Sequence, residues 1–315
     1  MIDYTICYKA RLPIDQQWAD SWDVFVSAFN SSERVKRVYE KVAATTKHWL
    51  VHHEYGYDAT EYPQGEVFAP PPGDEAEFLA AYFDRVGPQL GGARICVDTT
   101  GFMRPHLMLL LRYLDQHHVK RFDALYSEPD HYVKQEKTEF AGLPVINVRP
   151  VLGYEGTHST DTSNDVLVIG AGYDNALISH AAENKKSARK VQLFGLPSLR
   201  PDMYQENILR ARQAAESTGS GGLSDVDHHF APANDPFVVA SVLQSIVQME
   251  AQRRPITNLY LCPLATKPQA LGFALYYLAE RQSSATSMIF PFATSYSRET
   301  TSGLSRVWRY TVELP

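Results

Sequence analysis

Short apolar segments alternate with helical patterns along most of this chain. The clearest segment is 165–170 (Asp-Val-Leu-Val-Ile-Gly), in which apolar residues follow one another without a break. A continuous apolar run of this length is typical of a strand that is buried on both faces of a sheet. Strands that alternate with helices pair in parallel and carry helices on both faces. The sequence therefore predicts a Rossmann-like α/β fold with mostly parallel sheets.

Two series of such elements are expected, separated by the polar segment 153–164. The first series predicts strands at 2–8, 22–28, 47–51, 93–98 and 122–126, and helices after Ser32 and at 74–86 and 105–117. The second predicts strands at 165–170, 190–194, 258–262, 287–292 and 306–314, and helices at 175–184, 204–215, 236–252 and 269–282. We expect two halves, 1–155 and 165–315, which are either separate or share one continuous sheet.

Charge, cysteine content and hydropathy indicate which partners and which compartment the protein has. The chain of 315 residues has 36 acidic and 30 basic side chains, and its net charge of −6 argues against nucleic-acid binding over a broad basic surface. Its three cysteines each lie in an apolar run, as reduced thiols of cytoplasmic proteins do. The most apolar stretch, 107–111, is too short to span a membrane. We expect a cytoplasmic protein without a membrane segment.

Ligands of open α/β sheets bind beyond the carboxyl ends of the strands, where loops enter the helices. Unpaired amides and the helix dipole favour anions there. Four loops at such places are rich in hydroxyl, glycine or cationic residues, and we predict that they bind a ligand. The candidate residues are Asp98, Thr99, Thr100 and Arg104 in the first loop, Gly170, Gly172, Tyr173 and Asp174 in the second, Thr266 and Lys267 in the third, and Ser297 and Arg298 in the fourth.

Each residue type suggests a role. Arg104 and Lys267 both stand directly before a proline at a predicted helix start, and we expect them to counter the charge of a phosphate. Asp174 and Tyr173 are expected to face a sugar or a base. The segment 170–172 lacks the third glycine of the dinucleotide fingerprint, so it predicts a ligand-facing loop rather than an NAD site. Ordinary helix capping explains several of the same side chains without a ligand.

Two of these loops resemble a known family. Ala265-Thr266-Lys267-Pro268-Gln269 resembles the Gly-Thr-Lys loop of CARF domains, the CRISPR-associated Rossmann folds that sense cyclic oligonucleotides, with alanine in place of the glycine. Asp98-Thr99-Thr100-Gly101 is similar to the turn after the first strand of such folds, and the segment 23–27 resembles the opening strand of TIR-like Rossmannoids. The resemblance implies a regulatory nucleotide sensor in prokaryotic antiviral defence, whose output is carried by another protein.

The leading hypothesis is therefore a nucleotide-binding regulatory module in which Arg104 and Lys267 converge on one electropositive hollow. A nucleotide- or NAD-cleaving hydrolase is the second hypothesis, because general acid–base catalysis needs a carboxylate with a tuned pKa. The third is an interaction subunit that binds a partner protein or a second copy through aromatic side chains. The acid or base of the hydrolase would be Asp98, Glu128, Glu155 or Glu299, and the aromatic surface would comprise the loop 54–72 with Trp308 and Tyr310.

No metal site and no cofactor are predicted, and catalytic residues stay unassigned. The chain has three adjacent histidine pairs, at 52–53, 117–118 and 228–229. None has the i, i+4 spacing that directs two imidazoles of a helix at one ion. The sequence also lacks the P-loop and the Gly-x-Ser-x-Gly motif.

Overall fold

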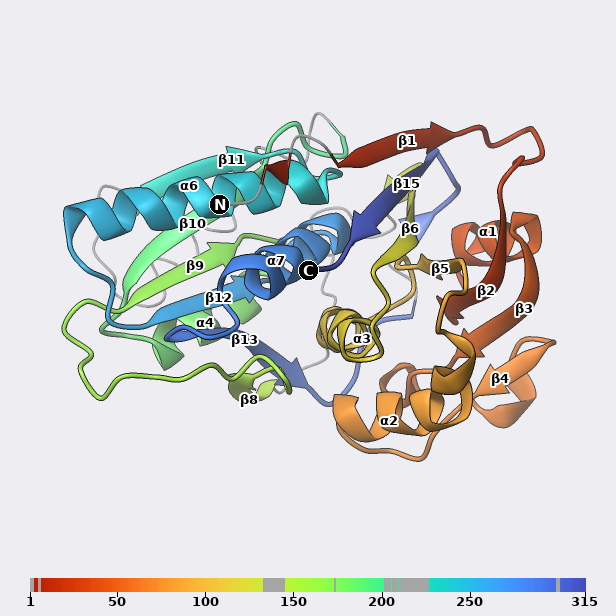
Figure 1. Cartoon of the computed structure of the whole chain (residues 1–315), viewed down its shortest axis with the longest axis horizontal. Coiled ribbons are helices and arrows are strands. Elements are labelled where there is room, and N and C mark those ends of the chain that lie inside the picture. The colour runs from red at the N-terminus through yellow and green to blue at the C-terminus, as the bar shows by residue number, and fades with distance from the viewer. Residues whose placement is uncertain are drawn as a thin grey trace. The chain divides into compact units, whose positions relative to one another are not determined.

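The computed structural model of the 315-residue chain describes residues 3–4, 7–132, 145–172, 174–200, 205, 209, 227–298 and 301–315. The chain forms two compact units, whose elements are labelled in Figure 1. Unit 1 comprises Met1–Ile6 and Ala141–Thr294, and unit 2 comprises Cys7–Phe140 and Ser295–Pro315. In the described part of the chain, no helix is both long and apolar enough to cross a bilayer.

Unit 2 is built on a seven-stranded sheet with the order β1-β15-β6-β5-β2-β3-β4. Neighbours from β4 to β6 are parallel, whereas β15 is antiparallel to both β6 and β1. The strands are β1 (Tyr8–Leu12), β2 (Ser21–Ala28), β3 (Ala43–Leu50), β4 (Glu66–Phe68), β5 (Ile95–Asp98), β6 (Arg121–Glu128) and β15 (Arg306–Glu313). The helices are α1 (Glu33–Lys41), α2 (Glu75–Val86) and α3 (Arg104–Gln116), with short 3-10 helices η2 (His53–Tyr55), η3 (Ala59–Glu61) and η4 (Gly87–Gln89). A small ribbon pairs β7 (His131–Tyr132) with β14 (Thr301–Ser302).

Unit 1 contains a six-stranded sheet with the order β11-β10-β9-β12-β13-β8, in which only β8 is antiparallel to its neighbour. The strands are β8 (Val145–Pro150), β9 (Val166–Gly170), β10 (Arg189–Gly195), β11 (Asp227–Ala231), β12 (Leu259–Pro263) and β13 (Thr286–Ala293). The described helices are α4 (Asn175–Asn184), α6 (Pro236–Arg253) and α7 (Lys267–Glu280). Every residue of β9 is buried, as its continuous apolar run predicts.

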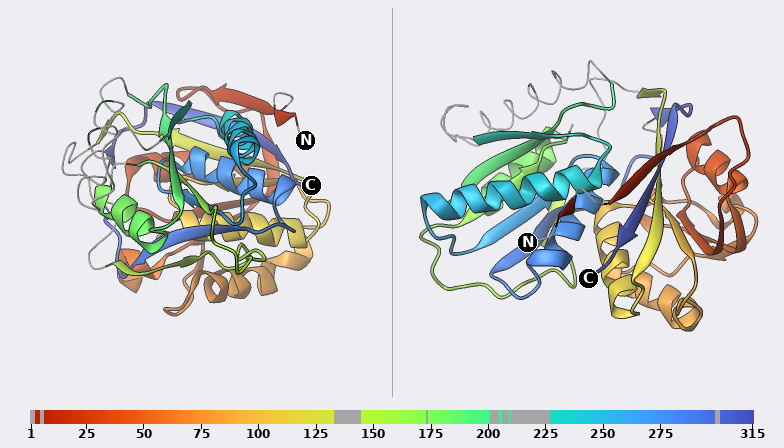
Figure 2. Two further views of the ribbon diagram at one scale, coloured as in Figure 1. Left: turned by 90° about the vertical axis from the view of Figure 1, so that its left-hand side faces the viewer. Right: turned by 45° about the horizontal axis from the view of Figure 1, so that its top comes forward.

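Both units repeat one topology. Numbered along the chain, the parallel strands β2 to β6 and the parallel strands β9 to β13 each lie in the order 3-2-1-4-5, the Rossmann order. In unit 2, α2 and α3 cover one face of the sheet and α1 covers the other (Figure 2). The predicted Rossmann-like class with two halves is therefore confirmed. The topological switch point, between strands 1 and 4, lies between β2 and β5 in unit 2 and between β9 and β12 in unit 1.

The bounds of the units differ from the expected division at 155–165. The strand expected to close the second half, β15, pairs along its whole length with β6 and adds β1 on its other edge, so it belongs to unit 2. Conversely, β8 pairs with β13 and belongs to unit 1. The two sheets are separate, not one continuous sheet. The expected helix 204–215 lies almost entirely outside the described residues.

A glycine brings the two loops at each switch point into backbone contact. In unit 2, a Cβ atom on Gly101 would lie 2.0 Å from the carbonyl oxygen of Ala28, the last residue of β2. In unit 1, a Cβ atom on Gly172 would lie 2.2 Å from the carbonyl oxygen of Leu264, which follows β12. Both turns therefore require glycine, because any side chain would collide with the backbone. This close packing sets the distance between the flanking loops.

Candidate functional site

Two of the four predicted loops meet at the switch point of unit 1. Gly170 ends β9 and lies opposite Pro263 of β12, and the amide of Leu264 donates to the Gly170 carbonyl at 2.9 Å. The second and third loops therefore flank the position where Rossmann-type sheets bind their ligands. Tyr173, the remaining candidate of the second loop, lies outside the described residues.

Several of these side chains also have structural roles. Asp174 is the N-cap of α4, and its carboxylate accepts a hydrogen bond from the amide of Leu177 at 3.2 Å. Thr266 is the N-cap of α7 and accepts from the amide of Gln269 at 3.3 Å, while its hydroxyl donates to the carbonyl of Ala233. Capping, which the sequence left as an alternative, accounts for both residues.

Gln269 is a polar residue that the sequence analysis missed. It is fully buried in the first turn of α7, and its Oε1 atom accepts from the amide of Thr266 at 3.4 Å. Its Nε2 atom has no hydrogen-bond partner among the described residues, and it lies 3.8 Å from where a Cβ of Gly195 would be. A buried donor thus faces the end of β10. Only its position three residues after the cap could have marked it.

The helix starts differ in charge, and this difference separates candidate anion sites from the others. An acidic residue at the N-cap or in the first turn competes with a bound anion for the positive end of the helix dipole. The helices α3 and α7 have no such acid and begin with the cations Arg104 and Lys267. The other described α-helices carry an acid there: Glu33 in α1, Asp74 in α2, Asp174 in α4 and Asp235 in α6.

These two helices occupy equivalent places, because each follows the fourth strand of its unit. Arg104-Pro105-His106 starts α3, and Lys267-Pro268-Gln269 starts α7. The third residue is buried in both cases, with His106 3% exposed and Gln269 0% exposed. Arg104 belongs to unit 2 and Lys267 to unit 1. The expected hollow that both cations would line therefore stays a prediction.

The first predicted loop joins three strand ends of unit 2. The hydroxyl of Thr99 donates to the Leu125 carbonyl at 2.8 Å, and the hydroxyls of Thr100 and Ser127 lie 2.9 Å apart. The carboxyl group of Asp98 accepts from the Thr100 amide at 3.0 Å and from the Ser27 hydroxyl at 3.1 Å. Burial raises the pKa of Asp98. These bonds hold the carboxyl ends of β2, β5 and β6 together.

The fourth loop packs on the segment 53–61 of the same unit. Arg298 donates to the carbonyls of Tyr55 and Gly56, pairs with Glu61 at 3.0 Å, and lies 4.3 Å from the ring centre of Tyr57. Ser297 precedes it and is partly buried. Arg298 therefore anchors a backbone segment of unit 2.

Three further side chains meet at the carboxyl edge of unit 2. His52 follows β3, Glu54 lies in η2 and His106 lies in the first turn of α3. Their ligand atoms are all within 4.8 Å of one another, and Glu54 Oε1 is 3.7 Å from His106 Nε2. The expectation of no metal site rested on the spacing of histidines along the sequence, and such spacing does not report on side chains that come together from three elements. The sequence signals were a His-x-Glu directly after a strand and a histidine at a helix start.

The ring of Phe78 packs against both histidines of this cluster. Phe78 stacks on His52 with ring centres 4.7 Å apart and meets His106 edge-on at 5.0 Å. Burial raises the pKa of Glu54 to about 7, and the negative charge of the buried Glu75 adds to this shift. The cluster thus offers two imidazoles and one carboxylate in a largely apolar environment.

Residues named by the two alternative hypotheses have internal partners. Glu128 is buried and accepts from the indole of Trp308 at 2.6 Å and from Arg306 at 3.2 Å. Glu155 accepts from the amide of Gly153 at 3.0 Å, and Glu299 lies outside the described residues. Tyr310 is fully buried and so cannot belong to the expected aromatic surface, whereas Trp308 is partly exposed.

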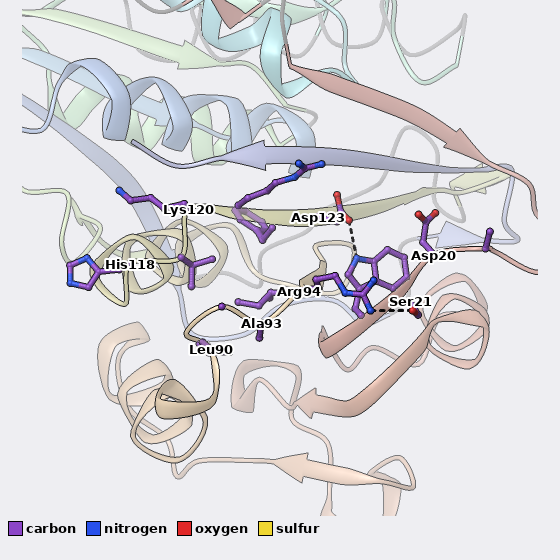
Figure 3. A pocket seen from close by; sticks show the side chains of 15 residues that line it. Asp20, Ser21, Leu90, Ala93, Arg94, His118, Lys120 and Asp123 are labelled. Atoms are coloured by element: carbon purple, nitrogen blue, oxygen red, sulfur yellow. Dashed lines mark hydrogen bonds between the residues drawn. The ribbon is translucent and has the colours of Figure 1, made fainter.

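A cavity of about 710 Å³ opens at the opposite, amino edge of unit 2 (Figure 3). It is lined by the starts of β2, β5 and β6, and several of its polar groups are already bonded. Asp123 accepts from the indole of Trp22 at 2.8 Å, and Arg94 donates to the hydroxyl of Ser21 at 3.3 Å. Because Rossmann-type sheets bind ligands at the carboxyl edge, we do not assign a site to this cavity.

No protein-family model matches the chain, and no curated protein matches it. Similar solved structures include the precorrin-6A reductase CobK, with 11% identity and a TM-score of 0.25 over 86% of this chain and 89% of that one. Another is an adenylation, ketoreductase and pseudo-Asub structure of a keto acid-selecting NRPS module, with 10% identity, a TM-score of 0.23, and 89% and 34% coverage. At such TM-scores these likenesses carry no argument about function. The fold and site define a two-unit Rossmann-like α/β protein.

Proposed function

We propose that this protein binds a nucleotide-like, phosphate-bearing small molecule at the carboxyl edge of unit 1 and acts as a regulatory sensor. The observation that carries the proposal is the start of α7, which follows β12 and carries both Lys267 and the buried Nε2 donor of Gln269. The resemblance of this loop to CARF domains supports a role in prokaryotic defence.

The charges and donors suit an anionic ligand. The 14-residue helix α7 presents the amides of its first turn and the positive end of its dipole at Thr266 and Lys267. An ammonium group beside these amides adds a counter-charge for phosphate. A buried amide donor without a partner costs about 1–3 kcal/mol, and a phosphate or sugar oxygen would remove that cost. The neighbouring α4 and α6 begin with Asp174 and Asp235, which disfavour an anion at their starts.

Isothermal titration calorimetry with ATP, NAD and a cyclic oligoadenylate tests the proposal on the full chain. Lys267→Ala should weaken the binding of the ligand about tenfold, the equivalent of about 1.4 kcal/mol, without lowering the melting temperature. Lys190→Ala is the matched control, because Lys190 lies on β10 of the same unit and donates to the Lys186 carbonyl. Absence of binding to all three probes, or equal affinity of the Lys267→Ala variant, would contradict the proposal.

A further inference from the structure

We propose that His52, Glu54 and His106 of unit 2 form a binding site for Zn²⁺. This site is separate from the ligand site proposed for unit 1, and neither proposal depends on the other. The three donors come from the loop after β3, from η2 and from the first turn of α3, so the fold itself brings them together.

The distances are close to those that coordination needs. Tetrahedral Zn²⁺ with bonds of about 2.0–2.1 Å places its ligand atoms roughly 3.3–3.5 Å apart. Glu54 Oε1 and His106 Nε2 are 3.7 Å apart, and all three ligand atoms lie within 4.8 Å of one another. Side-chain rotations that move these atoms by about 1 Å would complete the geometry, without a change in the backbone.

Neighbouring side chains hold the three proposed ligands in place. His52 is 0% exposed and His106 is 3% exposed, and Phe78 packs against both rings. On the outer side, His53 Nδ1 lies 3.4 Å from Glu54 Oε2, which leaves Oε1 directed at His106. Partners of this kind orient ligating side chains. Arg298 also bonds to the carbonyls of the two residues after Glu54 and so fixes the segment that carries it.

The donor set selects the class of metal. Two imidazole nitrogens and one carboxylate oxygen suit Zn²⁺, whereas Mg²⁺ and Ca²⁺ prefer oxygen ligands only. Three protein ligands leave the fourth position of Zn²⁺ open to water or to an oxygen of a substrate, as in catalytic rather than structural zinc sites. The His52–Glu54–His106 site therefore has the form of a metal centre that takes part in chemistry.

Metal titration of the full chain, freed of metal by chelation and of any affinity tag, tests the inference. Calorimetry with ZnCl₂ should show one strong site, and Glu54→Gln and His106→Ala should each weaken it at least about 100-fold, since loss of a residue that only orients a ligand already costs 10–100-fold. Substitution with Co²⁺ should give the intense visible bands of tetrahedral coordination, and both variants should lose them. MgCl₂ should give no strong site.

His48→Gln is the matched control. His48 is a buried histidine on β3 of the same unit, 2% exposed, and its Nδ1 is 2.9 Å from the hydroxyl of Tyr82 outside the cluster. This variant should bind Zn²⁺ as the parent protein does. Glu54→Gln changes no volume, so it decides the question if His106→Ala fails to fold. Zn²⁺ affinity that is unchanged in Glu54→Gln, or a Co²⁺ spectrum without tetrahedral bands, would overturn the inference.

Discussion

Alanine at Gly172 should destabilise unit 1 by steric overlap alone. The new methyl group would lie 2.2 Å from the carbonyl oxygen and 2.9 Å from the carbonyl carbon of Leu264, and backbone atoms cannot move aside as a flexible side chain does. Gly172 has no positive φ, so the backbone conformation itself suits alanine. Overpacking of this kind costs about 1–3 kcal/mol. A cost of 2 kcal/mol in a unit of this size lowers the melting temperature by roughly 4–8 °C.

Gly101 gives the same test in unit 2, because its methyl group would meet the carbonyl oxygen of Ala28 at 2.0 Å. Differential scanning calorimetry of Gly172→Ala, Gly101→Ala and the parent protein measures the shifts. Gly91→Ala is the control, since a Cβ atom there meets nothing within 4 Å and its φ is not positive. If Gly172→Ala and Gly101→Ala melt as Gly91→Ala does, the flanking loops do not touch at these glycines, and the backbone contact between the two loops at each switch point is incorrect.

Two further predictions concern buried ionisable groups of unit 2. Burial lowers the pKa of His48, so below about pH 6.5 the unfolded chain binds a proton that the folded chain does not, and stability falls as pH falls. Urea unfolding between pH 7 and pH 5.5 measures how the free energy of unfolding changes with pH. His48→Gln should reduce this change by up to about 1.4 kcal/mol per pH unit, and an equal pH dependence in the variant and the parent protein would refute the prediction. Glu128→Ala should cost about 2 kcal/mol, because it leaves the indole N–H of Trp308 without its acceptor, and Glu128→Gln should cost less. Equal urea midpoints of the Glu128 variants and the parent protein would contradict this assignment.

The sequence predicts the fold class well because its strongest signals are local. The unbroken apolar run of β9 specifies a strand buried on both faces, and alternating elements specify parallel pairing. The unit bounds depend on long-range pairing instead. Nothing within residues 306–313 distinguishes an antiparallel edge on β6 from a last strand beside β13, so β15 could not be assigned to its unit from the sequence.

Among the candidate site residues too, those with a local sequence signal were predictable and those placed by long-range contacts were not. Arg104 and Lys267 are at the helix starts that their prolines predict, because proline at this position is itself a local signal. The hydroxyl groups were less predictable, since Thr99 and Thr100 bond to β6, a strand that begins some twenty residues later. The His52–Glu54–His106 cluster could not be seen in the sequence, because its three side chains become neighbours only when η2 and α3 meet at one edge of the sheet.

Equivalent positions of the two units carry different polar side chains, which is why a metal site is proposed for unit 2 and not for unit 1. In each unit the third residue of the helix after strand 4 is buried and lies close to the end of strand 2 or just beyond it. In unit 2 that residue is His106, and His52 and Glu54 stand there to complete a donor set. In unit 1 it is Gln269, and the end of β10 is Gly195, which supplies no side chain. A shared topology thus presents two imidazoles and a carboxylate in one unit and a neutral amide donor in the other, as the proposed cation site and the proposed anion site require.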